Sequence, residues 1–394
     1  MKKVKMSLIT LLMVLGVILA GCSTESDKSS EPVAKENEVN KSSVETKDTS
    51  ESDLETIQYY FTANEGGSIS KIEAATNKVV DTIDVDGVVH NVQVSPDGKM
   101  LGATVILGGG EGHGEESYGE SDGNDSHGDS HEKSNGDSSH NNNSHGVGSM
   151  GKALFFDTDT NELLNTVEVG SHPANFVFTE DGKYALVTNT EDNNVSVIDM
   201  KSFTVTDTIK TGKGPHGFRI SADSQKAYIA NMSEDTISVV NLELLKEEKR
   251  IKVGSTPVTT GITSDGKTLV ATLNSENMLA IVDVKTEQIE KVEVGNGPAQ
   301  VYIDGNNKFA YVANQGTEEV PSNSVSVVDL VAKKVTATIE TGKGAHGVVT
   351  SSDNKRLYVT NMFENTVTII DTKQNKVIDT IEVGEMPNGI SIMN

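Results

Sequence analysis

Cysteine and tryptophan are almost absent from this sequence, which has one cysteine, Cys22, and no tryptophan in 394 residues. A single cysteine excludes an internal disulfide and a thiolate-bound metal cluster. Basic residues are also scarce: 33 lysines and arginines stand against 58 acidic residues, for a formal net charge of -25. Because binding of a phosphate backbone needs clustered lysine and arginine, this balance argues against a nucleic-acid partner.

The N-terminal residues predict export and membrane attachment. A lysine-rich start precedes one apolar run, residues 6–18, which is too short to span a bilayer comfortably. The next four residues, LAGC at 19–22, resemble a bacterial lipobox. The resemblance implies removal of a lipoprotein signal peptide, residues 1–21, and attachment of diacylglycerol to the Cys22 sulfur. We therefore expect a lipid-anchored protein on the extracytoplasmic face of the cell membrane.

Residues 22–56 are rich in Ser, Glu, Lys, Asp and Thr and contain almost no large apolar side chains. A segment of this composition cannot bury a core. We expect it to be a disordered linker between the anchor and a folded part that starts at residue 57.

One stretch of sequence recurs through the rest of the chain. Residues 211–231, TGKGPHGFRISADSQKAYIAN, return at 341–361 as TGKGAHGVVTSSDNKRLYVTN, and weaker copies occupy 169–189, 253–274 and 294–314. Each copy reads as a glycine-rich turn, an apolar strand, a polar turn, a second strand and a closing Asn. Val, Ile and Thr dominate these segments, as is typical of strands. A fixed repeat of this kind predicts a repeat architecture.

The repeats predict a closed ring. Their third strands are expected at residues 68–73, 153–157, 195–199, 237–241, 279–283, 325–329 and 367–371. This gives about seven units of about four strands. The first unit begins at its second strand, 59–64, and the missing first strand is found at the far end of the chain, 386–392. The sequence therefore predicts an all-β, seven-bladed β-propeller over 57–394, in which the C-terminal strand closes the N-terminal blade.

The end of the second strand identifies the repeat type. Tyr358-Val359-Thr360-Asn361, with variants at 186–189, 228–231 and 311–314, resembles the YVTN-type β-propeller family. The resemblance covers nearly all of 57–394 and implies the propeller fold. It leaves function open, because this architecture hosts binding proteins, haem enzymes such as the cytochrome d1 domain of nitrite reductases, and lactonases.

One predicted blade carries an insertion, residues 108–150, between its second and third strands. The insertion has no apolar periodicity, so we expect a mobile loop. Imidazoles interleaved with carboxylates suit Zn(II), Cu(II) and Ni(II), and this composition predicts loose collection of metal ions. The loop holds five of the nine histidines, namely His113, His127, His131, His140 and His145.

The other four histidines fall in equivalent turns of the repeat. The residue after the proline of Gly-x-x-Pro-x-Gly is expected at the mouth of the central channel. His90, His216 and His346 occupy this position in three blades, and His172 lies two residues earlier in a fourth. Each histidine alone could simply bond a neighbouring loop, but other blades carry Ala or Asn there, so the fold does not require histidine. Imidazoles converging on one axis predict a Zn(II) site, with Cu(II) as the alternative.

Further donors are expected on the same face. Met232 and Met362 follow the closing Asn of two histidine-bearing blades. Thioether ligands would favour copper, whereas apolar packing at the rim is the simpler interpretation. A carboxylate ligand could come from nearby loops, with Glu234, Glu364 and Asp192 as candidates.

Strand direction relates the two groups of histidines. Because consecutive antiparallel strands alternate in direction, the turn before a first strand and the loop after a second strand share one face. The insertion is therefore expected above His90, His172, His216 and His346, as a loose collector above a more rigid receiving site.

This arrangement resembles the propeller metallochaperones that work beside bacterial zinc ABC transporters. The resemblance implies a monomeric surface lipoprotein that binds, buffers or delivers zinc to such a transporter or its binding protein, without catalysis. Two alternatives stay open. One is an enzyme in which His90, His216 or His346 ligates haem or a catalytic metal. The other is a protein-binding surface module in which the histidines are incidental.

Overall fold

The computed structural model describes residues 58–107 and 150–393. Within these residues, no helix is long and apolar enough to cross a membrane. Several predictions concern residues outside the described ones, namely the signal peptide 1–21, the lipid site Cys22, the linker 22–56 and the insertion histidines His113, His127, His131, His140 and His145.

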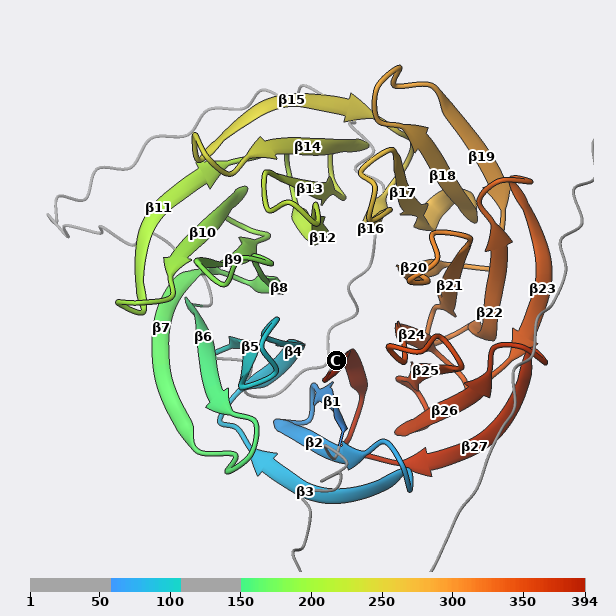
Figure 1. Cartoon of the computed structure of the whole chain (residues 1–394), viewed down its shortest axis with the longest axis horizontal. Coiled ribbons are helices and arrows are strands. Elements are labelled where there is room, and N and C mark those ends of the chain that lie inside the picture. Colours follow the sequence, from blue (N-terminus) through green and yellow to red (C-terminus); the bar gives the residue numbers. More distant parts are fainter. Residues whose placement is uncertain (1–57, 108–149, 394) are drawn as a thin grey trace, which may run out of the picture. The chain divides into compact units, whose positions relative to one another are not determined.

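The described residues form seven antiparallel sheets of four strands, arranged around one axis as the blades of a propeller (Figure 1). From the axis outward, blade 1 contains β28 (Pro387–Ile392), β1 (Tyr59–Asn64), β2 (Ser68–Glu73) and β3 (Lys78–Asp84). Blade 2 contains β4 (Val88–Val94), β5 (Met100–Ile106), β6 (Met150–Asp157) and β7 (Leu163–Ser171). Blade 3 contains β8 (Pro173–Phe178), β9 (Tyr184–Asn189), β10 (Asn194–Asp199) and β11 (Thr204–Lys210).

The remaining blades follow the same order. Blade 4 contains β12 (Pro215–Ile220), β13 (Lys226–Asn231), β14 (Thr236–Asn241) and β15 (Lys246–Lys252). Blade 5 contains β16 (Pro257–Ile262), β17 (Thr268–Leu273), the 3-10 turn η1 (Asn274–Glu276), β18 (Met278–Asp283) and β19 (Ile289–Glu293). Blade 6 contains β20 (Pro298–Ile303), β21 (Phe309–Gly316), β22 (Pro321–Asp329) and β23 (Lys334–Glu340). Blade 7 contains β24 (Ala345–Thr350), β25 (Arg356–Asn361), β26 (Thr366–Asp371) and β27 (Lys376–Glu382).

The C-terminal strand closes the ring, as the sequence predicts. β28 pairs with β1 in an antiparallel ladder that places Tyr60 opposite Ile392 and Thr62 opposite Ile390. The prediction of an all-β, seven-bladed propeller closed by its C-terminal strand is therefore confirmed. One boundary differs, because β6 already begins at Met150, the last residue assigned to the insertion.

Burial falls from the axis to the circumference. The second strands are buried along nearly their whole length, as in β9 and β13, because both faces pack against neighbouring blades. This explains their continuous apolar sequences. The fourth strands, such as β3 and β11, are mostly exposed and carry polar residues. The hydrophobic core therefore lies between blades, as a series of inter-blade clusters.

The closing Asn of the repeat is a structural clamp. Asn361 is fully buried, and its Nδ2 donates to Thr366 Oγ1 at 2.9 Å and Thr368 Oγ1 at 2.8 Å on the next strand. Its Oδ1 accepts the Gly342 N–H at 3.1 Å. A Cβ at Gly342 would lie 2.7 Å from the Asn361 amide carbon, so the turn needs glycine at this close approach. One side chain thus joins the turn before the first strand to the third strand.

Replacing Asn361 by Ala is expected to lower the free energy of unfolding by about 1–3 kcal/mol, because the Gly342 N–H loses its acceptor and the hydroxyl oxygens of Thr366 and Thr368 lose their donor. Chemical denaturation followed by circular dichroism measures the change. Blade 5 supplies the control, because Leu273 stands there in place of the Asn. Met278, which pairs with Leu273, and Ala280 stand in place of the two threonines. A triple variant, N361L with T366M and T368A, should recover stability; a full loss in that variant would contradict the clamp.

Candidate functional site

The glycine-rich turns and the loops after the second strands meet at one rim of the ring. The backbone N–H of Met232 donates to Gly214 O and that of Met362 to Gly344 O, each at 2.9 Å. This confirms the shared face expected from strand direction. The residues that flank the insertion belong to the same rim, because Ile106 pairs with both Val88 and Gly151. We call this the histidine rim.

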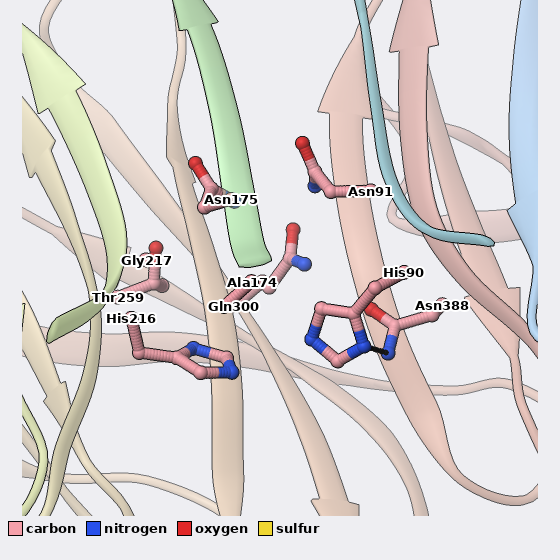
Figure 2. Close-up of a pocket in the computed structure, with 9 residues that line it drawn as sticks. All are labelled: His90, Asn91, Ala174, Asn175, His216, Gly217, Thr259, Gln300 and Asn388. Carbon is pink, nitrogen blue, oxygen red and sulfur yellow. Dashed lines mark hydrogen bonds between the residues drawn. The ribbon is translucent and has the colours of Figure 1, made fainter. Parts of the chain in front are cut away.

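His90, on β4, and His216, on β12, point into the tunnel and face each other across a cavity of about 10 Å³ (Figure 2). Ala174 and Asn388 hold the equivalent positions on β8 and β28 and line the same cavity. The structure therefore confirms that the residue after the repeat proline faces the axis in these blades. The space is large enough for about one water molecule or one ion.

The imidazoles are held in defined orientations by their Nδ1 atoms. Nδ1 of His216 lies 3.2 Å from Val258 O, and Nδ1 of His346 lies 3.2 Å from Asn388 O. A carbonyl oxygen only accepts, so Nδ1 is the donor in both neutral rings. Nε2 then carries the lone pair in each, which is the form in which imidazole binds a metal.

Glu65 contacts the candidate site, and the sequence interpretation missed it. Its Oε1 lies 3.1 Å from His90 Nδ1 and accepts Asn388 Nδ2 at 2.6 Å. Burial acts to raise the pKa of Glu65, but the hydrogen bond and charge of His90, the Asn388 amide and the charge of His346 bring that pKa below its ordinary value. Glu65 directly follows the closing Asn64, the position that Met232 and Met362 hold in their blades, so aligning that position would have found it.

The distances between ring centroids show that three of the four histidines lie close together. His90 lies 5.5 Å from His216 and 6.2 Å from His172, both edge-on. His172 is the more exposed, at the rim itself, with Nδ1 4.0 Å from the Glu191 carboxylate. His346 is buried and interacts electrostatically with Glu65, but it does not line the cavity between His90 and His216.

Three of the other expected donors, Met362, Glu234 and Asp192, are engaged elsewhere. Met362 is buried and its Sδ accepts the Gln315 amide at 3.4 Å, which fits packing at the rim. Glu234 binds Arg250 at 2.7 Å, and Asp192 accepts the Ser171 N–H at 2.8 Å.

The residues present fit a metal ion in part. Two imidazoles on one zinc ion, with Zn–N near 2.0–2.1 Å, hold their ring centroids about 5 Å apart. The His90–His216 separation of 5.5 Å is close to this value. Among residues 58–107 and 150–393, however, no three His, Cys, Asp or Glu side chains are grouped as a complete metal site. A third protein ligand therefore requires a change of rotamer, for example at His172, or a donor outside those residues.

Solved structures with the same fold are distant in sequence. A protein of unknown function from Desulfotomaculum acetoxidans superimposes with a TM-score of 0.66 at 13% identity, over 85% of this chain and 99% of that one. A putative 6-phosphogluconolactonase from Bacteroides fragilis gives 0.63 at 14% identity, over 86% and 99%. Hydrazine synthase from Kuenenia stuttgartiensis gives 0.61 at 19% identity, over 77% and 89%. At these identities the likeness concerns the fold alone.

No curated protein matches the sequence. The profile of the YNCE-like beta-propeller family matches twice, over residues 153–303 and 245–394. The two matches together extend from β6 to the end of the chain and cover more than half of it. The chain therefore belongs to the YNCE-like beta-propeller family.

Proposed function

We propose that this propeller binds a transition-metal ion at its histidine rim, as cargo to be buffered or delivered and without catalysis. Zn(II) is the favoured ion and Cu(II) the alternative. The observation that carries the proposal is the pair His90 and His216, whose rings face each other at 5.5 Å. A carboxylate and a backbone carbonyl hold their Nδ1 atoms. A bonded Nδ1 of this kind is typical of imidazoles that bind metals through Nε2.

The size of the cavity favours an ion over an organic substrate. About 10 Å³ between the imidazoles accepts a single water-sized group, whereas a lactone or a haem needs far more space. The carboxylate of Glu65, with its lowered pKa, adds negative charge beside His90 and so attracts a cation. The net charge of -25 acts in the same direction over the whole surface.

The rest of the proposal follows from the sequence. The lipid on Cys22 would hold the protein at the cell surface, and His113, His127, His131, His140 and His145 would collect ions loosely. Ile106 and Gly151, close to the two ends of the insertion, belong to the histidine rim, which supports the proposal that the collecting segment acts on this face. A metal ABC transporter or its binding protein is the proposed receiver, and the protein is proposed to act as a monomer.

Zinc titration of the full chain, purified without a His tag and against a chromogenic competitor, tests the proposal. We expect one tight site and several weaker ones. The double variant H90A/H216A should weaken the tight site about 100-fold or more, and E65Q should weaken it about 10–100-fold as the loss of an orienting partner. Deleting 108–149 should remove only the weak sites.

The controls follow from the repeat. Alanine already stands at the His216 position in blades 3 and 6, as Ala174 and Ala299, so H216A should fold normally. A tight site unchanged in H90A/H216A, or absent from the wild type with both zinc and copper, would exclude the proposed function. A Soret band, or lactone hydrolysis lost in H346A, would favour the enzyme alternative instead.

A further inference from the structure

A second cavity lies in the central tunnel, farther from the histidine rim. Its volume is about 80 Å³, several times that of the cavity between the imidazoles. Asn91 and Gln300 line both cavities and separate them. Five innermost strands, β4, β12, β20, β24 and β28, contribute to its wall.

The charged group in this cavity is Arg219, on β12. Among the described residues, its guanidinium makes one hydrogen bond, from Nη1 to the Phe218 carbonyl oxygen at 2.9 Å. Arg219 is partly buried beside Tyr302, and the loss of hydration there lowers the pKa of Arg219. A guanidinium carries five N–H donors and stays charged in proteins, so four donors of this cavity-lining side chain have no hydrogen-bond partner among the described residues.

An unpaired cation inside a protein is costly unless a counter-ion or several hydrogen bonds compensate it. The wall of this cavity offers further polar groups, from Gln93, Gln300, Tyr302 and Ser391. Amide and hydroxyl donors beside a guanidinium fork are the groups that bind oxyanions. The other innermost strands carry uncharged residues at the position of Arg219, such as Gln93, Tyr302 and Val349, so the repeat itself does not require a cation here.

We infer that Arg219 and the polar side chains around it form a binding site for one small oxyanion inside the tunnel, of the size of phosphate, sulfate or a short carboxylate. The volume of the cavity corresponds to several water-sized atoms, which suits these ions and excludes a nucleotide or a sugar phosphate. The site does not depend on the metal proposal, because it shares no charged side chain with the histidine rim.

Isothermal titration calorimetry tests the site on the full chain, freed of metals and kept in chloride buffer at constant ionic strength. The probes are sodium phosphate, sodium sulfate and sodium acetate. We expect saturable binding of at least one probe at one site per chain. R219Q should weaken it about 10–100-fold, the effect of losing charge-assisted hydrogen bonds. R250Q is the matched control, because Arg250 is a surface residue already paired with Glu234 and Glu247. The R250Q variant should bind the probe with wild-type affinity.

A melting curve separates anion binding from a structural role of Arg219. In chloride alone, R219Q should melt at the wild-type temperature or above it, and it should lack the stabilisation that the bound probe gives the wild type. Equal affinity in the wild type and R219Q, or no saturable binding of any probe by the wild type, would overturn the inference. If R219Q does not fold, anomalous diffraction from wild-type crystals soaked in selenate decides. The selenium peak must place a selenate oxygen within hydrogen-bond distance of the guanidinium, and selenium found only elsewhere refutes the site.

Discussion

A chain that ends at Gly384 is expected to lose the closed ring and to unfold where the full chain is stable. Such a chain lacks β28, the only partner of the inner edge of β1 in the described structure. It also loses the contacts of the loop after β1, whose Glu65 and Gly66 N–H groups donate to Met386 O and Glu385 O at 3.1 Å. The innermost strands of blades 7 and 2 would then face a gap.

The expected loss is comparable with the whole stability of a domain. Ile390 and Ile392 are buried against Tyr60 and Tyr358 in one inter-blade cluster, and each buried aliphatic side chain contributes about 1.5–3 kcal/mol. The ladder with β1 adds several hydrogen bonds at about 1 kcal/mol each. The sum, roughly 5–10 kcal/mol, falls within the total of 5–15 kcal/mol typical of native proteins.

Urea unfolding and size-exclusion chromatography measure the effect. In the matched control, residues 385–393 are joined to the N-terminal side of Gln58 through a short linker. This chain contains β28 and still ends after β27. A short linker suffices because the Met393 N–H donates to Tyr59 O at 2.8 Å. The control should fold. A truncated chain with wild-type cooperativity and midpoint would refute the structural role of the closing strand.

Phe155→Ala is expected to lower the free energy of unfolding by about 3–5 kcal/mol. Phe155 lies on β6 of blade 2, fully buried, with its ring 5.5 Å from that of Phe176 and 5.1 Å from that of Phe203, both in blade 3 and edge-on. Its removal leaves a cavity between two blades and breaks the edge-to-face contacts. The backbone has already adapted to this cluster: a Cβ at Gly102 would lie 2.3 Å from the Phe176 ring.

Denaturant unfolding again provides the measurement. L163A is the surface control, because Leu163 in the same blade is 54% exposed, and its loss should change the free energy by less than about 0.5 kcal/mol. Phe155→Leu should fall between the two, since most of the volume remains. Equal effects of F155A and L163A would mean that this aromatic cluster does not join blades 2 and 3.

The ring itself was predictable because the number of repeats gives the number of blades and each repeat gives the strands of one blade. The glycine turn, the Asp turn and the closing Asn recur because each makes contacts within its own blade, as the Asn361 clamp does. Such contacts depend on residues close together in one copy of the repeat, so the sequence pattern reveals them. Closure was predictable for the same cause, since a first blade without its first strand must find that strand elsewhere. The start of β6 was not, because Met150 is surrounded by glycine and serine and gains its strand conformation only from pairing with Ser171.

The position of the candidate site in the repeat was predictable, but the burial of its side chains and the residues they contact were not. Aligning the turns singled out His90, His172, His216 and His346, of which the structure places His90 and His216 on one cavity. The contact of His90 with Glu65 joins two blades and appears only when the ring closes. Arg219 is the clearest case. In the sequence it stands as an isolated cation in an acidic protein, and only the structure shows that it is partly buried in a cavity lined by polar groups of other blades.

The ring places the two ends of its described chain and its histidines on opposite rims. The described chain enters at Gln58 and leaves at Met393 on one rim, where the Met393–Tyr59 hydrogen bond joins these ends, and the histidines lie at the other rim. A molecule that contacts the histidine rim therefore meets the face opposite to the two ends of the described chain.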